Sequence, residues 1–382
     1  MVPRSLLVVG SFREETAQRV REAALAAGAT PEFHARCDEA KPGLGDKDPL
    51  AVVVRMDAPG ADALCAQVRT QARLADVPIF GVSSERTDLG FTELFSWGGD
   101  DLVSLWSPQP LTRRLRPLVG RKPRTAEGSG EGQGCAIVAG ADARWRSVMG
   151  RSLYSGGFSV RFVASAADLA SDSLGPAVRL VVAFDDIGPE GAAACAVQAR
   201  AAGSEAAWVV VVPPKRMAAS IAGVSALPRV AVADGFAPPE NVLFLANELL
   251  GRRGQDQRAS SRLLYGTTVA FRSAGRDEDE SGFSYNISAG GIYVRSLAPL
   301  EQGQEVWLEM WAPRSERRLR LCGSVAWKRP FGSGERATVP AGFGVKIEGG
   351  LGGDLERWRL GYEAFAESLL GARAPSASGP EV

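Results

Sequence analysis

Hydrophobic and polar positions follow two different periods along the chain, and the change of period divides it into two regions. Up to roughly residue 250, runs of consecutive apolar residues are followed by stretches in which apolar residues recur every three or four positions. Beyond roughly residue 260, apolar residues mostly occupy every second position, which is typical of strands with one buried face. The pattern therefore predicts α/β structure first and β structure afterwards.

The α/β region contains two similar successions of elements, about 130 residues apart, which we interpret as an internal duplication. In each half, short apolar runs alternate with helical stretches, and this predicts a parallel sheet with helices on both faces. In the first half we expect strands at 5–10, 50–54, 77–82 and 101–105, and helices at 13–27, 61–74 and 110–119. In the second half we expect strands at 135–140, 159–163, 179–184, 207–212 and 230–233, and helices at 143–154, 191–202 and 239–250.

The third region predicts a small antiparallel barrel with a filled interior, because several strands of period two are joined by turns. Val306, Leu308 and Met310 share one face of a strand, and Trp307, Glu309 and Trp311 share the other. The expected strands are 264–271, 283–287, 291–294, 305–311, 317–328 and 341–348. A helical pattern at 354–370 should cap the barrel.

Composition shifts mark the expected domain boundaries. Residues 121–134 are rich in glycine and charge and have no apolar periodicity, so they indicate a flexible linker. Residues 374–382 have the composition of a disordered tail. We therefore expect α/β domains at 1–120 and 135–251 and a barrel domain at 252–373.

The charge balance and the reactive side chains exclude several classes of protein. Lys plus Arg and Asp plus Glu are both 44, whereas a general DNA or anionic-membrane binder carries a basic excess. No apolar run reaches the ~18 residues that span a bilayer, so we expect no membrane insertion and a cytoplasmic location. The five cysteines are scattered, and His34 is the only histidine. We expect no disulfide framework, no metal site and no histidine-based catalytic triad in the third region.

Two short motifs in the third region offer groups that suit an anionic ligand. Residues 286–291 read N-x-S-x-x-G, with Asn286 and Ser288 as short polar groups and Gly290 and Gly291 leaving room for close approach. About two dozen residues upstream, Arg258 and Arg262 form R-x-x-x-R. A planar guanidinium binds a phosphate or a guanine edge through two parallel hydrogen bonds.

Together, in this order and followed by a barrel pattern, these motifs resemble the PilZ family of cyclic di-GMP receptors. The resemblance spans residues 252–373 and implies cyclic di-GMP as the ligand, without a cofactor and without catalysis. Carried over residue by residue, it implies that Arg258, Arg262, Asn286, Ser288, Gly290 and Gly291 contact the ligand. Asn286 stands where the family more often has aspartate, which is within its pattern.

Both α/β halves resemble the receiver domain of response regulators, a flavodoxin-like fold. The likeness lies in residues 55–60 and 185–190 after the third strand, and in Gly98-Gly99-Asp100-Asp101 before the fifth. The phosphoacceptor position holds Arg55 in the first half and Asp185 in the second.

The phosphorylation chemistry of receivers is incomplete in both halves. The acidic pair that holds Mg²⁺ is replaced by Gly10 and Ser11 in the first half and by Gly140 and Ala141 in the second. The lysine position holds Leu105 and Asp234, so neither half can neutralise a transferring phosphoryl group as receivers do. We therefore expect degenerate receiver-like domains that contact an unknown protein partner and relay ligand occupancy to it.

Two alternatives remain open from the sequence. One is an adaptor that binds no nucleotide and acts only through protein contacts. The other is a phosphorylation-regulated response regulator, which would require Asp185 to accept phosphate without the usual neighbours.

Overall fold

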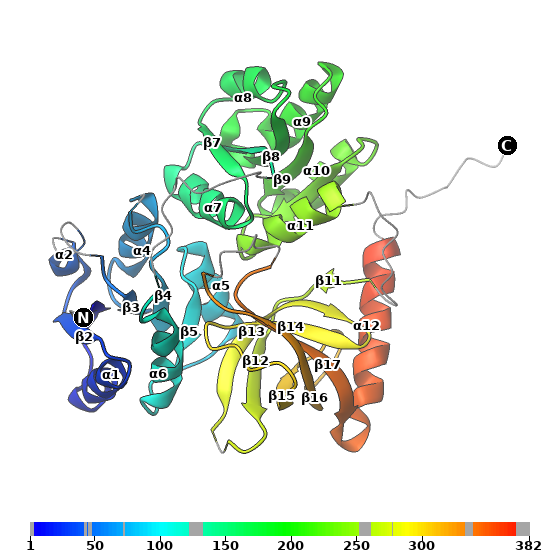
Figure 1. Ribbon diagram of the computed structural model, residues 1–382. Coiled ribbons are helices and arrows are strands. Elements are labelled where there is room, and N and C mark those ends of the chain that lie inside the picture. The colour runs from blue at the N-terminus through cyan, green and yellow to red at the C-terminus, as the bar shows by residue number, and fades with distance from the viewer. Residues whose placement is uncertain are drawn as a thin grey trace. The chain divides into compact units, whose positions relative to one another are not determined.

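The computed structural model describes residues 4–41, 44, 48–71, 73–121, 133–251, 261–276, 278–332 and 339–371 (Figure 1). The chain divides into two compact units. One comprises Met1–Asp256, Ser296–Ala298 and Arg329–Ala341, and the other Gln257–Arg295, Pro299–Lys328 and Gly342–Val382. Most of the expected linker and the whole of the expected tail lie outside the described residues, and the domain boundaries stay predictions.

The first α/β half is a parallel sheet of five strands in the order β2-β1-β3-β4-β5. The strands are β1 (Ser5–Val9), β2 (Thr30–His34), β3 (Ala51–Arg55), β4 (Ile79–Val82) and β5 (Asp101–Val103). The main helices are α1 (Glu14–Ala26), α2 (Cys37–Ala40), α4 (Ala61–Thr70), α5 (Asp88–Ser96) and α6 (Gln109–Leu115).

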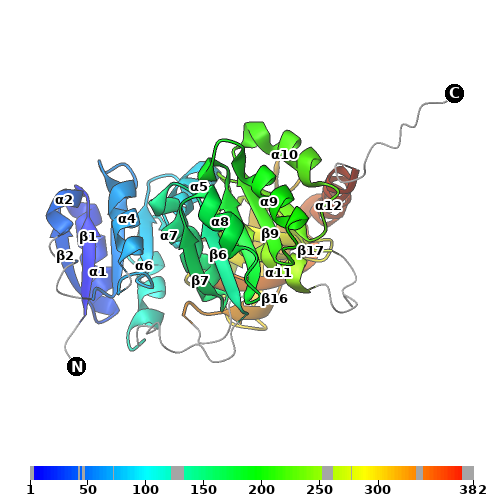
Figure 2. The same ribbon diagram turned by 90° about the horizontal axis from the view of Figure 1, so that it is seen from above.

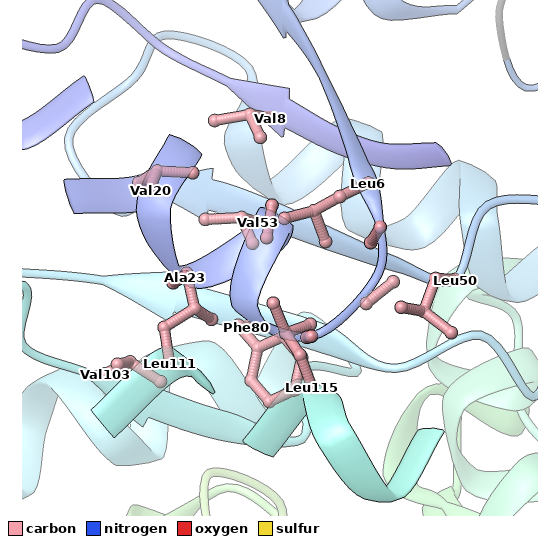
Figure 3. Packing of buried hydrophobic residues seen from close by; sticks show 14 of the residues in the cluster. Leu6, Val8, Val20, Ala23, Leu50, Val53, Phe80, Val103, Leu111 and Leu115 are labelled. Atoms are coloured by element: carbon pink, nitrogen blue, oxygen red, sulfur yellow. The ribbon is translucent and has the colours of Figure 1, made fainter. Parts of the chain in front are cut away.

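The central strands of this sheet supply two hydrophobic cores, one on each face. Leu6 and Val53 pack with α1 and α6 on one face (Figure 3). Leu7 and Val52 pack with α2 and α4 on the other. Because both faces are covered, these strands read as continuous apolar runs and not as alternating ones.

The second α/β half, coloured green in Figure 2, has the same strand order, which confirms the predicted fold class. Its sheet runs β10-β9-β8-β6-β7. The strands are β6 (Cys135–Ala139), β7 (Ser159–Val163), β8 (Val178–Phe184), β9 (Ala207–Val212) and β10 (Val230–Asp234). The helices are α7 (Ala143–Ser155), α8 (Ala166–Asp172), α9 (Gly191–Ala201), α10 (Met217–Val224) and α11 (Glu240–Gly251).

The apolar pattern did not predict β2, α2, α5, α8 and α10. The β2 strand is a half-exposed edge strand that carries Pro31, so it lacks the apolar run of a central strand. The α5 helix contains Gly90 in its first turn, and its N-terminus is instead fixed by the Thr87 side chain, which accepts the Gly90 N–H. Short or edge elements carry too few buried residues to show a period.

The third region is a closed antiparallel barrel with a C-terminal helix, as predicted. The strand order is β11-β13-β12-β15-β16-β17-β14, and pairing of β13 with β14 closes the barrel. The elements are β11 (Leu263–Leu264), β12 (Thr268–Ser273), β13 (Glu280–Ser288), β14 (Gly291–Arg295), β15 (Glu305–Trp311), β16 (Arg318–Arg329), β17 (Gly342–Gly350) and α12 (Asp354–Gly371) (Figure 1). Trp358 and Tyr362 of α12 pack into the same core as the barrel interior.

The single strand expected at 264–271 is split into β11 and β12. The break is stabilised by Ser284 of β13, whose hydroxyl accepts the Thr267 N–H at 2.8 Å and donates to the Tyr265 carbonyl at 2.5 Å. One side chain thus supplies the hydrogen-bond partner for the Thr267 N–H and the Tyr265 carbonyl at the break. Among the described residues, no helix has the length and hydropathy of a membrane span.

Candidate ligand site

The N-x-S-x-x-G motif forms the β13–β14 hairpin. Ser288, the last residue of β13, pairs with Gly291, the first residue of β14, which leaves Ala289 and Gly290 as the turn. The Ser288 hydroxyl lies 3.4 Å from the Gly291 carbonyl, to which it donates across the turn. The Ile347 N–H of β17 donates to the Gly290 carbonyl at 3.0 Å. The turn is therefore held from inside the hairpin and from the next strand.

Asn286 and Ser288 share one face of β13. Ile287 between them packs into the barrel core, and successive side chains of a strand point to opposite faces. Asn286 is only 4 % exposed, while Ser288 is half-buried. The two polar groups that the sequence singled out are thus placed on the outward side of the barrel wall, next to the turn.

The two glycines of the motif serve different purposes. A Cβ at Gly291 would lie 2.7 Å from the Val345 carbonyl, so this glycine permits the close approach of β14 to β17. A Cβ at Gly290 would meet nothing within 4 Å, so no packing contact requires glycine there and the space beside it is open. Neither glycine has a positive φ, so neither is required by the backbone conformation of the turn.

Strand β11 brings the arginine motif to the hairpin. Leu263 pairs with Ile287 and Leu264 with Asn286 in antiparallel register. Arg262 directly precedes β11, so one further step of this register places it beside Ser288. Arg258, the other predicted arginine, lies outside the described residues.

Helix α12 holds both parts of the candidate site through two aromatic side chains. The Trp358 indole N–H donates to the Ala289 carbonyl in the turn at 3.2 Å. The Tyr362 hydroxyl donates to the Ser261 carbonyl, next to Arg262, at 2.6 Å. The helical spacing predicted both residues only as core residues, and the polar ends of their rings were the missed signal.

The receiver-like position in the first half is filled by a salt-bridged arginine. Arg55, at the end of β3, donates to an Asp57 carboxylate oxygen at 2.8 Å and also to the Ser11 carbonyl after β1. The Arg55 guanidinium holds the pKa of Asp57 below its ordinary value. Leu105, at the lysine position, is buried in the core.

The corresponding position in the second half holds two carboxylates with internal partners. Asp186 accepts the N–H groups of Ala141 at 2.8 Å and Asp142 at 3.1 Å. Asp185 is 8 % exposed and forms an ion pair of 2.6 Å with Arg216. Within the described ranges, no group of three or more His, Cys, Asp or Glu residues could hold a metal ion.

Comparison with protein families identifies the third region. Residues 256–358 match the model of the PilZ domain, so they form a PilZ domain, as the sequence predicted. The match includes Arg258, Arg262, the hairpin and Trp358. PilZ domains are a family of cyclic di-GMP receptors. A search of curated proteins found no match.

Solved structures that resemble parts of the chain include response regulators. A Chloroflexus aurantiacus protein described as a response regulator is 22 % identical, with 31 % of this chain and 99 % of that chain covered and a TM-score of 0.28. The chemotaxis response regulator CheY4 of Vibrio cholerae is 18 % identical, with 31 % and 99 % covered and a TM-score of 0.28. The Bacillus subtilis inhibitor of motility is 20 % identical, with 30 % and 52 % covered and a TM-score of 0.24, so the chain spans about half of it. With TM-scores this low, these structures do not support the fold assignment, which rests on the strand order.

Proposed function

We propose that the protein is a cytoplasmic signalling protein that binds cyclic di-GMP at the β13–β14 hairpin of its PilZ domain. The pairing of β11 with β13 carries this proposal, because it joins two motifs that lie about two dozen residues apart in the sequence. The receiver-like halves then act as interaction modules that pass ligand occupancy to a protein partner.

The chemistry of the site suits a cyclic dinucleotide. Arg258 and Arg262 supply guanidinium groups for phosphate oxygens and for guanine O6 and N7. Asn286 and Ser288 supply hydrogen-bonding groups for a base edge or the sugar-phosphate, and Gly290 leaves open space beside them. Trp358 and Tyr362 are positioning residues, since they bind backbone carbonyls of the turn and of Ser261.

Calorimetric titration of the full chain with cyclic di-GMP tests the proposal. We expect micromolar or tighter binding and a loss of about 10- to 100-fold on Arg258→Ala or Arg262→Ala. A hydrogen bond to a charged group contributes roughly 1.5–3 kcal/mol, and about 1.4 kcal/mol corresponds to a tenfold change. Ser288→Ala should weaken binding less, because a neutral hydroxyl contributes less than a guanidinium.

Arg272→Ala is the matched control, since Arg272 lies on β12 and faces Asp279 at 3.8 Å, away from the hairpin. Its affinity should equal that of the unmodified chain. Equal titrations of the unmodified chain and Arg262→Ala would show that the site assignment is wrong. No binding heat from the unmodified, folded chain at any concentration tested would favour the adaptor without a nucleotide.

A further inference from the structure

Helix α7 of the second α/β half is buried on two faces. Met149 and Leu153 pack into the core of their own sheet. Val148, Arg151 and Ser152 lie on another face of the helix and are also largely inaccessible. Val148 is 7 % exposed, Ser152 is 9 % exposed, and the Arg151 side chain is 13 % exposed. A helix that covers only its own sheet would leave this second face in water.

Helix α4 of the first half has a matching second face. Leu64, Cys65 and Val68 point into their own core. Ala66 and Arg69 lie on a different side of the helix and are 6 and 3 % exposed. Helices α4 and α7 pack against each other within the same compact unit.

The two helices meet closely at the turn before β5. Gly98 has a φ of 88°, and a Cβ there would lie 3.1 Å from a Val148 methyl group and 2.8 Å from the Arg69 side chain. The backbone of the first half thus receives Val148 of the second half at a glycine. At the rim, Arg144 of α7 lies 3.6 Å from Asp62 of α4.

A buried carboxylate is shared between the two halves at the centre of this contact. One Asp100 oxygen accepts from Arg69 and from the Ile79 N–H, both at 2.8 Å. The other accepts from Arg151 of α7 at 2.9 Å. Burial opposes the charge of Asp100, but Arg151 and Arg69 outweigh it and hold the pKa of the carboxyl below its ordinary value.

We infer that the α4–α7 contact joins the two α/β halves into one rigid body, with Asp100 bridging Arg69 and Arg151. Separation would leave Arg69 and Asp100 paired but would expose the Val148 face and remove one of the donors to a charged, desolvated carboxylate. The two receiver-like halves therefore keep one fixed arrangement relative to each other. This inference does not depend on ligand binding by the barrel.

A thiol introduced by Ala66→Cys in the full chain reports on this contact. Cys65, its neighbour, points into the first core, where burial raises the pKa of the thiol to about 12. Iodoacetamide labelling followed by peptide mass mapping can measure both thiols separately. Opening of the contact alone makes only the introduced thiol reactive, whereas unfolding of the half makes both reactive.

We expect the introduced thiol to react at least about 10-fold more slowly than an exposed reference thiol from Ala222→Cys. Adding Arg151→Glu should bring it close to the reference rate while Cys65 stays protected. If Arg151→Glu exposes Cys65 too, the neutral Arg151→Gln replaces it and should give a smaller acceleration confined to the introduced thiol. The inference is wrong if the introduced thiol already reacts at the reference rate while Arg151 is unchanged. It is also wrong if the introduced thiol stays protected in both Arg151 variants.

Discussion

The two α/β halves share a strand order but place their charged groups differently. In the first half, the Asp100 side chain before β5 is 6 % exposed and lies between Arg69, which is inaccessible to water, and Arg151 of the second half, which is 13 % exposed. In the second half, Asp185 at the end of β8 pairs with Arg216, whose side chain is 46 % exposed. Both carboxylate side chains are 6 % exposed, so the halves differ in the arginine partners: those of Asp100 are buried, whereas that of Asp185 reaches into water.

The difference explains what each group contributes. Desolvation of a charge costs several kcal/mol, so a buried carboxylate is tolerated only with complete pairing, and loss of one partner is expensive. A pair at the rim is screened by water and contributes little when it is broken. The pairs of Asp100 in the GGDD segment are therefore enclosed on both sides, whereas the pair of Asp185 opens to water through Arg216.

The largest effect is expected from Arg69→Met. Arg69 donates to Asp100 and also to the carbonyls of Gly98 and Val77, both at 2.7 Å. Its removal leaves these acceptors buried with fewer donors, so the free energy of unfolding should fall by about 3–5 kcal/mol. Chemical denaturation monitored by circular dichroism measures the change.

Arg161→Met in the second half is the control for this comparison. Arg161 lies 3.2 Å from Asp172, and its side chain is 55 % exposed. Its loss should cost no more than about 1 kcal/mol. Similar losses from both substitutions would contradict the distinction between buried and rim pairs.

A smaller effect is expected from pH. Because the pKa of Asp100 is lower in the folded chain than its ordinary value of about 3.9, the unfolded chain binds the proton more readily. The contribution of Asp100 to stability is then complete above this ordinary value and is lost as pH falls through the depressed pKa. Asp100→Asn should lower stability at neutral pH and flatten its decline with pH in the acid range. An unchanged acid slope in denaturation series from neutral to acid pH would count against this role of Asp100.

The sequence predicted the fold class of both halves because the strands are buried on two faces and carry continuous apolar runs. It did not predict that Asp100 is buried between two arginines. Only the resemblance to receiver domains had singled out this residue. Its partners Arg69 and Arg151 lie 31 and 51 residues away, on helix faces that no local period distinguishes. Charges paired over such distances become visible only once the helices are packed.

The family motif names the residues of the candidate site in order, and their role in binding stays a prediction. The adjacency of Arg262 and Ser288, in contrast, depends on the register of β11 with β13, and the apolar pattern merged β11 with β12. The aromatic residues of α12 looked like ordinary core residues, since a hydrophobic period does not show where an indole N–H or a phenol hydroxyl points.

The smallest effects on the free energy of unfolding are expected at the rim of the second half. We also expect no phosphorylation there. Arg216→Ala should cost about 1 kcal/mol, since Arg216 is half-exposed and water can reach the buried Asp185 carboxylate once this side chain is removed. Neither the unmodified chain nor this variant should gain the mass of a phosphoryl group on incubation with acetyl phosphate and Mg²⁺. Asp186 is already bound to the N–H groups of Ala141 and Asp142, and no lysine faces a transferred phosphoryl group, because Asp234 stands in its place.

Intact-mass spectrometry of the full chain measures this outcome, with Asp185→Asn as the matched variant. A phosphoryl gain that Asp185→Asn abolishes would show that the acceptor chemistry survives despite the changed neighbours. A gain that appears only in Arg216→Ala would show instead that the ion pair with Arg216 alone blocks Asp185. We expect no gain in any of the three chains. The second half has the strand order of a receiver, but its carboxylates are already bound, Asp186 to the backbone and Asp185 to Arg216.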